Sequence, residues 1–129
     1  MEQQKYLIDT NAIIDYLGNK IPYSGMQFMN TIIDSIPNIS IITKIEVLGC
    51  NTNNSEYQLL TDFMEDANVI ELSKNVAEFC IELRKNHKIK LPDAIIASTA
   101  LATDSALITR NITDYKNING LVVINPYTL

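Results

Sequence analysis

Short apolar runs and longer amphipathic segments follow one another along this 129-residue chain. The short runs predict strands, and the longer segments, whose apolar residues recur every three to four positions, predict helices. The expected strands are residues 6–8, 39–42, 69–72, 106–109 and 121–124. The expected helices are residues 12–17, 26–35 and 56–67, two helices capped by Thr43 and Ser73 that run to about Cys50 and Asn86, and one that opens at Pro92. Residues 18–24 are expected to form a loop.

This order of elements predicts an α/β fold. Strands that alternate with helices long enough for crossovers indicate a parallel five-stranded sheet with helices on both faces. The length suits one ordinary domain, residues 1–129, with a single substantial core. In such sheets, ligands collect beyond the carboxyl ends of the strands, where the strand order reverses. Candidate functional residues are therefore those that directly follow strands.

Four acidic residues fit that description or lie at a helix start nearby. Asp9 ends the first strand, Glu46 lies one helical turn after the second, and Asp114 follows the fourth. Asp93, in the segment KLPDAIIAST, shares a helix face with apolar residues. Four converging carboxylates repel one another unless a cation compensates. Oxygen ligands without His or Cys suit Mg²⁺ or Mn²⁺, which often complete their shells with substrate phosphate.

Each acid also has a purely structural explanation. Asp9 can cap the helix that it precedes, and Asp114 can organise a turn. Thr43 and Glu46 fit a capping box, and Asp93 fits an acid that answers the helix dipole. Taken singly, these explanations are at least as good as the functional ones. The joint pattern favours a metal site.

The charge balance alone argues against a polyanionic partner. Ten Lys and Arg face fifteen Asp and Glu, for a net charge of −5, whereas nucleic-acid binding usually leaves a basic footprint. Pooling four acids around a metal removes most of that objection. The remaining basic residues are either solvated side chains or contacts to phosphate, and the candidates for phosphate contacts are Lys85, Lys88, Lys90 and Arg110.

Other features of the chain indicate a reduced, cytoplasmic protein. Cys50 and Cys80 have no spacing typical of a disulfide framework or a zinc site. The N-terminal segment MEQQKYLIDT lacks the pattern of a secretory signal. No apolar run approaches the roughly 20 residues that a membrane span needs, so we expect no membrane association.

Four segments together carry a resemblance to a known family. LIDTN, SIITKIEVLG, LPDAIIASTAL and LITRNITDY, in this order and at these separations, resemble the PIN domain and, within it, the VapC toxin ribonucleases of bacterial type II toxin–antitoxin pairs. The similarity covers essentially the whole chain. It implies a three-layer PIN-like fold with a parallel sheet between helices and an acidic pocket that binds Mg²⁺ or Mn²⁺.

The resemblance also implies residue roles. The four acids of the family match Asp9, Glu46, Asp93 and Asp114, with Asp9 and Asp93 holding the ion and the other two completing the cluster, binding a second ion or positioning water. Polar positions that help to hold the site match Thr10, Asn11, Thr109 and Asn111. Tyr115 closes the last motif where Phe is frequent, and we expect no catalytic consequence from this change.

The resemblance therefore predicts a metal-dependent endoribonuclease toxin that hydrolyses RNA, forms a homodimer and is neutralised by a small antitoxin protein. Apolar residues that are available for those interfaces, unless they belong to the core, are Ile13, Ile14, Tyr16, Leu17, Met26, Phe28 and Met29. The RNA target and the number of ions are not readable from the chain.

Two other functions are open. One is a catalytically inactive PIN-like module that only binds a partner. The other is an aspartyl-phosphate phosphotransferase or hydrolase with Asp9 as nucleophile. That chemistry normally has a second Asp two positions on, where this chain has Asn11.

Overall fold

A parallel sheet of five strands forms the centre of the computed structural model, which describes residues 4–129. The strands are β1 (Lys5–Ile8), β2 (Asn38–Ser40), β3 (Asn68–Ile70), β4 (Ser105–Ile108) and β5 (Val123–Ile124). They lie in the order β3-β2-β1-β4-β5, and every neighbouring pair is parallel. The predicted α/β fold with a five-stranded parallel sheet is confirmed.

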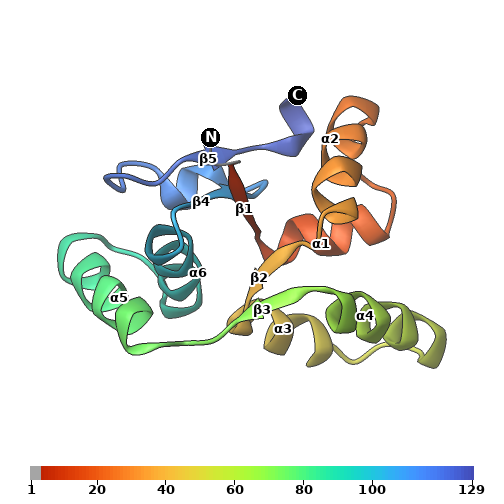
Figure 1. The fold of residues 1–129 in the computed structure, drawn as a ribbon, viewed down its shortest axis with the longest axis horizontal. Coiled ribbons are helices and arrows are strands. Elements are labelled where there is room, and N and C mark those ends of the chain that lie inside the picture. Colours follow the sequence, from red (N-terminus) through yellow and green to blue (C-terminus); the bar gives the residue numbers. More distant parts are fainter. Residues whose placement is uncertain (1–3) are drawn as a thin grey trace.

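Helices cover both faces of this sheet (Figure 1). The helices are α1 (Thr10–Leu17), α2 (Tyr23–Asp34), α3 (Ile41–Leu48), α4 (Asn54–Asp66), α5 (Lys74–Asn86) and α6 (Leu91–Ala102). Two short 3₁₀ helices, η1 (Ile112–Tyr115) and η2 (Pro126–Thr128), lie in stretches where no element was expected. Figure 1 shows α5 and α6 on one side of β1, and α1 and α2 on the other. None of the helices in residues 4–129 is long and apolar enough to cross a membrane.

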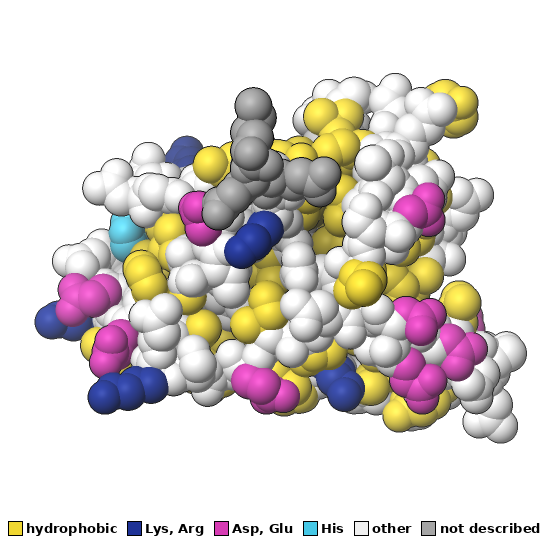
Figure 2. Space-filling view, viewed as in Figure 1, with side chains coloured by type: hydrophobic (Ala, Val, Ile, Leu, Met, Phe, Trp, Pro, Cys, Tyr) yellow, Lys and Arg dark blue, Asp and Glu magenta, His cyan; other side chains and the backbone are white. Residues whose placement is uncertain are grey.

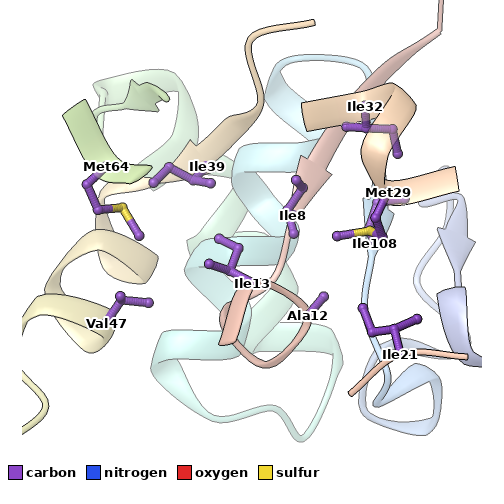
Figure 3. Packing of buried hydrophobic residues seen from close by; sticks show 10 residues of the cluster. All are labelled: Ile8, Ala12, Ile13, Ile21, Met29, Ile32, Ile39, Val47, Met64 and Ile108. Atoms are coloured by element: carbon purple, nitrogen blue, oxygen red, sulfur yellow. The ribbon is translucent and has the colours of Figure 1, made fainter. Parts of the chain in front are cut away.

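Alternating strand residues divide the interior into two cores. Because successive side chains of a strand point to opposite faces, Leu7 and Ile8 enter different layers. Ile8 and Ile108 belong to the core beneath α1, α2 and α4, which Figure 3 shows. Leu7 and Leu107 belong to the core beneath α5 and α6. The sheet is therefore buried on both faces, as a three-layer fold requires.

The junction between β2 and α3 differs from the prediction. Ser40 ends β2 and caps α3, since its side chain accepts a 3.2 Å hydrogen bond from the backbone N–H of Ile42. Ile41 and Ile42 are therefore helical, and the prediction of a strand to Ile42 with Thr43 as the cap was wrong. The physical reason is that two residues able to cap stand three positions apart, and the earlier one caps the helix.

Other element boundaries also shift by a few residues. Helix α2 begins at Tyr23, directly after Pro22, so that the end of the expected loop is helical. Strand β5 has only two residues, Val123 and Ile124, where four were expected. The cap of α5 was predicted correctly, because the Ser73 hydroxyl accepts from the backbone N–H of Val76 at 3.2 Å.

The strand order reverses between β1 and β4. From β1 the chain moves outward through β2 to β3, then returns to place β4 on the other side of β1. The backbone N–H of Asp9 donates to the carbonyl of Ile108 at 2.9 Å, so the ladder continues to the carboxyl ends of both strands. Ligands of open α/β sheets bind at this kind of crevice.

Candidate active site

Asp9 is a buried carboxylate at the carboxyl end of β1. Its side chain is 4% exposed and caps α1 by accepting from the Thr10 N–H at 2.8 Å on Oδ1. On Oδ2 it accepts from the Thr109 hydroxyl at 2.7 Å, the Tyr115 hydroxyl at 3.2 Å and the Asn11 side-chain amide at 3.3 Å. Burying a carboxylate is costly unless hydrogen bonds compensate, and four donors compensate here. The capping role of Asp9 is therefore real, and it leaves Oδ1 with a single backbone donor.

Asp93 lies in the first turn of α6, half-buried, before a run of buried residues from Ala94 to Ala100. The Tyr115 hydroxyl contacts its Oδ1 at 3.4 Å. Asp9 and Asp93, far apart in the sequence, are thus both within reach of one hydroxyl group. The structure brings together the two residues that were expected to hold the ion.

The neighbouring acids raise the pKa of Asp93. Burial is the largest cause, followed by the negative charges of Asp9 and Asp114, with a smaller contribution from Glu46. The hydrogen bond from Tyr115 acts in the opposite direction, because it stabilises the carboxylate. The other three acids are therefore close enough to affect the pKa of Asp93. An interaction with the helix dipole alone does not account for the surroundings of Asp93.

Glu46 is exposed on α3 and points to the same edge of the sheet. Its Oε1 accepts a 2.6 Å hydrogen bond from the Thr10 hydroxyl, which also lies 3.1 Å from the buried Thr43 hydroxyl. Ser40 caps this helix, so the capping box suggested for Thr43 and Glu46 is not the arrangement found. Thr10 instead connects Glu46 to Asp9, because its hydroxyl donates to Glu46 and its backbone N–H donates to Asp9.

Asp114 is exposed in η1, the short helix that follows β4. Its backbone N–H donates to the carbonyl of Asn111 at 3.1 Å. Asp114 therefore takes part in a turn, as its purely structural explanation predicted. Its charge nevertheless raises the pKa of Asp93. The two roles coexist, with Asp114 at the rim of the site.

Three of the four expected supporting residues, Thr10, Asn11 and Thr109, donate hydrogen bonds to Asp9, and the fourth, Asn111, donates to Thr109. The Asn11 side-chain oxygen accepts from the Arg110 N–H at 3.1 Å while its amide donates to Asp9. The Thr109 hydroxyl accepts from the Asn111 N–H at 3.1 Å. Asn11 therefore orients Asp9 and anchors the loop after β4. Its amide does not act as an acid or a base.

Tyr115 is the site residue that sequence reasoning missed. Its ring is buried, with 2% exposed, and its hydroxyl donates toward both Asp9 and Asp93. Burial raises the pKa of the Tyr115 hydroxyl, and the two carboxylates raise it further, so the group stays protonated. The available signal was the hydroxyl itself, because a buried Tyr usually finds a hydrogen-bond partner.

The acids do not form a ready-made cage. Among residues 4–129, no group of three or more His, Cys, Asp and Glu side chains is placed to hold a metal ion together. Asp9 and Asp93 contact the same hydroxyl, whereas Glu46 and Asp114 are exposed, so only two carboxylates meet closely at the site. This donor set still fits Mg²⁺, which commonly binds one or two carboxylates and keeps several waters or takes substrate phosphate.

The basic residues suggested for phosphate contacts differ in whether they already have a partner within the protein. Lys85 pairs with Glu82 at 3.6 Å on the surface of α5, and Lys88 and Lys90 are exposed. Arg110 donates to Asp15 at 3.0 Å and lies over the Tyr127 ring, 5.8 Å from its centre, so it ties the loop after β4 to α1 and to η2.

On the face drawn in Figure 2, acidic side chains gather over α4 and basic ones are scattered. The sequence of α4 carries Glu56, Asp62, Glu65 and Asp66 and no Lys or Arg. This face is therefore not the basic footprint of a nucleic-acid surface.

Comparisons with known proteins agree with this geometry. Residues 6–120 match the PIN domain family. The chain is 30% identical over 134 residues to ribonuclease VapC2 of Rickettsia felis, covering 93% of this chain and 96% of that protein. In a toxin–antitoxin complex from Klebsiella pneumoniae, one chain is 33% identical with a TM-score of 0.74, covering 95% of this chain and 98% of that one.

A second solved relative is VapBC2 from Rickettsia felis, bound to a DNA fragment from its promoter. It is 25% identical with a TM-score of 0.78, and the match covers 95% of this chain and 98% of that one. VapBC from Salmonella typhimurium, 23% identical with a TM-score of 0.80, shares the fold. The resemblance drawn from four short motifs is confirmed along nearly the whole chain. The chain belongs to the PIN domain family and, within it, to the VapC ribonuclease toxins of toxin–antitoxin systems.

Proposed function

We propose that this chain hydrolyses RNA with Mg²⁺ or Mn²⁺ held by Asp9 and Asp93, as the toxin of a type II toxin–antitoxin pair. One observation carries the proposal: the hydroxyl of Tyr115 lies 3.2 Å from Asp9 and 3.4 Å from Asp93. Two carboxylates this close at the switch point of the sheet repel each other, and a cation bound by both would offset that repulsion. The similarity to ribonuclease VapC2 supports RNA as the substrate.

Each residue has a distinct role in this proposal. When bound, the ion supplies Lewis-acid polarisation of the scissile phosphate and lowers the pKa of an attacking water. Asp9 is held rigidly by its four donors, so that it keeps its position when phosphate arrives. Glu46, exposed beside Thr10, accepts the proton of the water that attacks phosphorus. A bond from phosphorus to the water oxygen forms as the bond from phosphorus to the leaving oxygen breaks, and the leaving oxygen takes up a proton from solvent water.

Asp114 and two lysines complete the proposed substrate surface. Asp114 at the opposite rim helps to hold the ion or orders its waters. Lys88 and Lys90, exposed on the segment that leads into α6, bind phosphates on either side of the cleaved bond. Arg110 is engaged by Asp15 and Tyr127, so a phosphate contact by Arg110 would compete with this internal pairing.

The proposed antitoxin occupies a groove between α1, α3 and α4. A cavity of about 490 Å³ is lined by residues of α1, α3 and α4, among them Ile14, Leu17 and Leu59. Ile14 lies about one helical turn after Thr10, whose hydroxyl contacts Glu46, so a bound segment that continues along α1 would approach the acids. Of the interface candidates, Ile13 and Met29 are fully buried core residues and cannot contribute, whereas Ile14 is 40% exposed.

A homodimer is the proposed assembly state. Leu72, Ile81 and Leu91 expose large apolar side chains and line one cavity of about 580 Å³ between α5 and α6. Exposed apolar patches of this kind are typical of interaction sites. Introducing a charge with Ile81→Glu should convert a dimer to monomers in light scattering, and an unchanged mass would exclude this face.

Expression of the chain alone in bacteria tests the proposed function. We expect growth arrest with the wild-type chain and relief with Asp9→Asn or Asp93→Asn. Asp66→Asn, which removes the same charge from the exposed end of α4, should still arrest growth. Circular dichroism of each purified variant checks that the fold is intact. Unchanged toxicity in both site variants would contradict the assignment of the site, and Mn²⁺ binding without RNA cleavage would favour an inactive binding module.

A further inference from the structure

The Tyr115 hydroxyl contacts both principal acids of the site. Among the hydrogen bonds of residues 4–129, it alone reaches both Asp9 and Asp93. The other side-chain donors to Asp9, from Asn11 and Thr109, do not extend to Asp93. Tyr115 is therefore the direct connection between the end of β1 and the start of α6.

The position of this hydroxyl is fixed by the core behind it. The ring of Tyr115 is 2% exposed and packs in the cluster that includes Leu7, Ile96 and Leu107. Such interiors are close-packed, so the ring cannot move without displacing its neighbours. The phenolic oxygen is the only polar atom of this side chain, and it stands at the boundary between the core and the acids.

The two contacts share one proton. The distances of 3.2 Å and 3.4 Å both exceed the roughly 2.5–2.7 Å of a hydroxyl bonded to a single carboxylate. The hydroxyl therefore lies between two acceptors and does not close onto either. A neutral donor in this place holds the carboxylates at a set separation and lessens their repulsion.

The contacts also decide which oxygens are left for a ligand. On Asp9 the hydroxyl contacts Oδ2, which two other side chains also contact, so Oδ1 has only the Thr10 N–H. On Asp93 it contacts Oδ1. The other oxygen of each carboxylate, Oδ1 of Asp9 and Oδ2 of Asp93, makes no hydrogen bond to Tyr115. Outer residues that orient metal ligands in this way commonly affect metal affinity.

We infer that Tyr115 is a positioning residue whose hydroxyl sets the spacing and orientation at which Asp9 and Asp93 bind a divalent cation. This inference rests on the proposed function, since it assumes that these two acids hold the ion. Phenylalanine at this position would fill the same volume in the core and leave both carboxylates without their shared donor.

Isothermal titration calorimetry of Mn²⁺ into the metal-free full chain, without RNA, tests the inference. We expect Tyr115→Phe to weaken Mn²⁺ binding by roughly 10- to 100-fold while the far-ultraviolet spectrum stays unchanged. The matched control is Tyr16→Phe, which removes a hydroxyl that donates to Asn30 at 2.6 Å, and it should bind as the wild type does. In RNA cleavage, the half-saturating Mn²⁺ concentration should rise for Tyr115→Phe, and excess Mn²⁺ should restore the rate.

Other results would overturn the inference in distinguishable ways. Wild-type affinity in Tyr115→Phe would remove the positioning role and leave the proposed function standing. A Tyr115→Phe chain that does not fold would show that the hydroxyl serves folding, and this too would contradict the inference. A wild-type chain that neither binds Mn²⁺ nor cleaves RNA would overturn the proposed function and the inference together.

Discussion

The Thr109 hydroxyl donates a 2.7 Å hydrogen bond to Oδ2 of Asp9, joining the residues that directly follow β4 and β1. Both residues are buried, and parallel pairing of the two strands brings them together. The first acid of the site is thus oriented by the neighbouring strand, across the point where the strand order reverses.

Thr109→Val should destabilise the protein by about 1.5 to 3 kcal/mol, because it removes a buried hydrogen bond to a charged group and keeps the shape of the side chain. Urea unfolding of the metal-free protein measures this change. Thr113→Val is the matched control, since Thr113 is exposed in η1 and should be nearly neutral. Equal stability of the two variants would show that the Thr109 contact contributes nothing.

Removing the charge of Asp93 should stabilise the metal-free protein at neutral pH. In the folded state the pKa of Asp93 lies above the ordinary value of 3.8, chiefly because of burial and then because of the charge of Asp9. The folded state therefore binds the proton more tightly, and stability falls as the pH rises through the raised pKa. Asp93→Asn should melt above the wild type at neutral pH, and the difference should shrink toward pH 3.8.

Thermal melting in a chelator across this pH range measures the effect. Asp66→Asn, an exposed acid far along α4, should show no comparable gain. A wild-type protein that melts above Asp93→Asn at neutral pH would contradict the argument. Added Mn²⁺ should raise the melting temperature of the wild type alone, because ligand binding to the folded state stabilises it.

Gly25→Ala should separate η2 from α2. A Cβ atom at Gly25 would lie 1.8 Å from the carbonyl oxygen of Pro126, which belongs to the backbone and cannot rotate away. We expect a loss of about 1–3 kcal/mol, typical of overpacking, measured by urea unfolding. Gly18→Ala is the control and should cost less, because a Cβ atom at Gly18 would come no closer than 3.2 Å to its nearest neighbour, the Ile14 oxygen. A neutral Gly25→Ala would mean that η2 does not dock closely on α2.

Ile14→Glu should impair antitoxin binding and spare RNA cleavage. Ile14 lines the groove beside α1 and is 40% exposed, so the charge disturbs the groove more than the core. A hot-spot residue near the centre of an interface contributes about 2 kcal/mol or more, and we expect a loss of this size if Ile14 is central to the antitoxin interface. Calorimetry with a purified candidate antitoxin gives the affinity, with the exposed Ile36→Glu as control. Undiminished affinity would exclude this groove as the antitoxin site.

The order of elements was predictable because the hydrophobic period changes clearly between strands and helices. Boundaries were less predictable where two residues compete for one role. Ser40 and Thr43 can both cap a helix, and the choice depends on where β2 stops pairing with its neighbours. Tyr23 and Ser24 carry no apolar period, so the early start of α2 was not visible.

The site was predictable to the extent that it follows from sheet geometry. Asp9 and Thr109 directly follow neighbouring parallel strands, and their meeting is a consequence of that pairing. The role of Tyr115 was not predictable, since its partners lie 22 and 106 positions away and the hydroxyl aims at both. Glu46 has a spacing that equally fits a cap, and only the structure directs it to Thr10.

Diffraction from Mn²⁺-soaked crystals, with anomalous scattering at the manganese edge, tests the central claim most directly. We expect a peak within ligand distance of both Asp9 and Asp93, on the carboxylate oxygens that Tyr115 does not contact. A peak that touches only one of these carboxylates, or that lies elsewhere on the molecule, would contradict it.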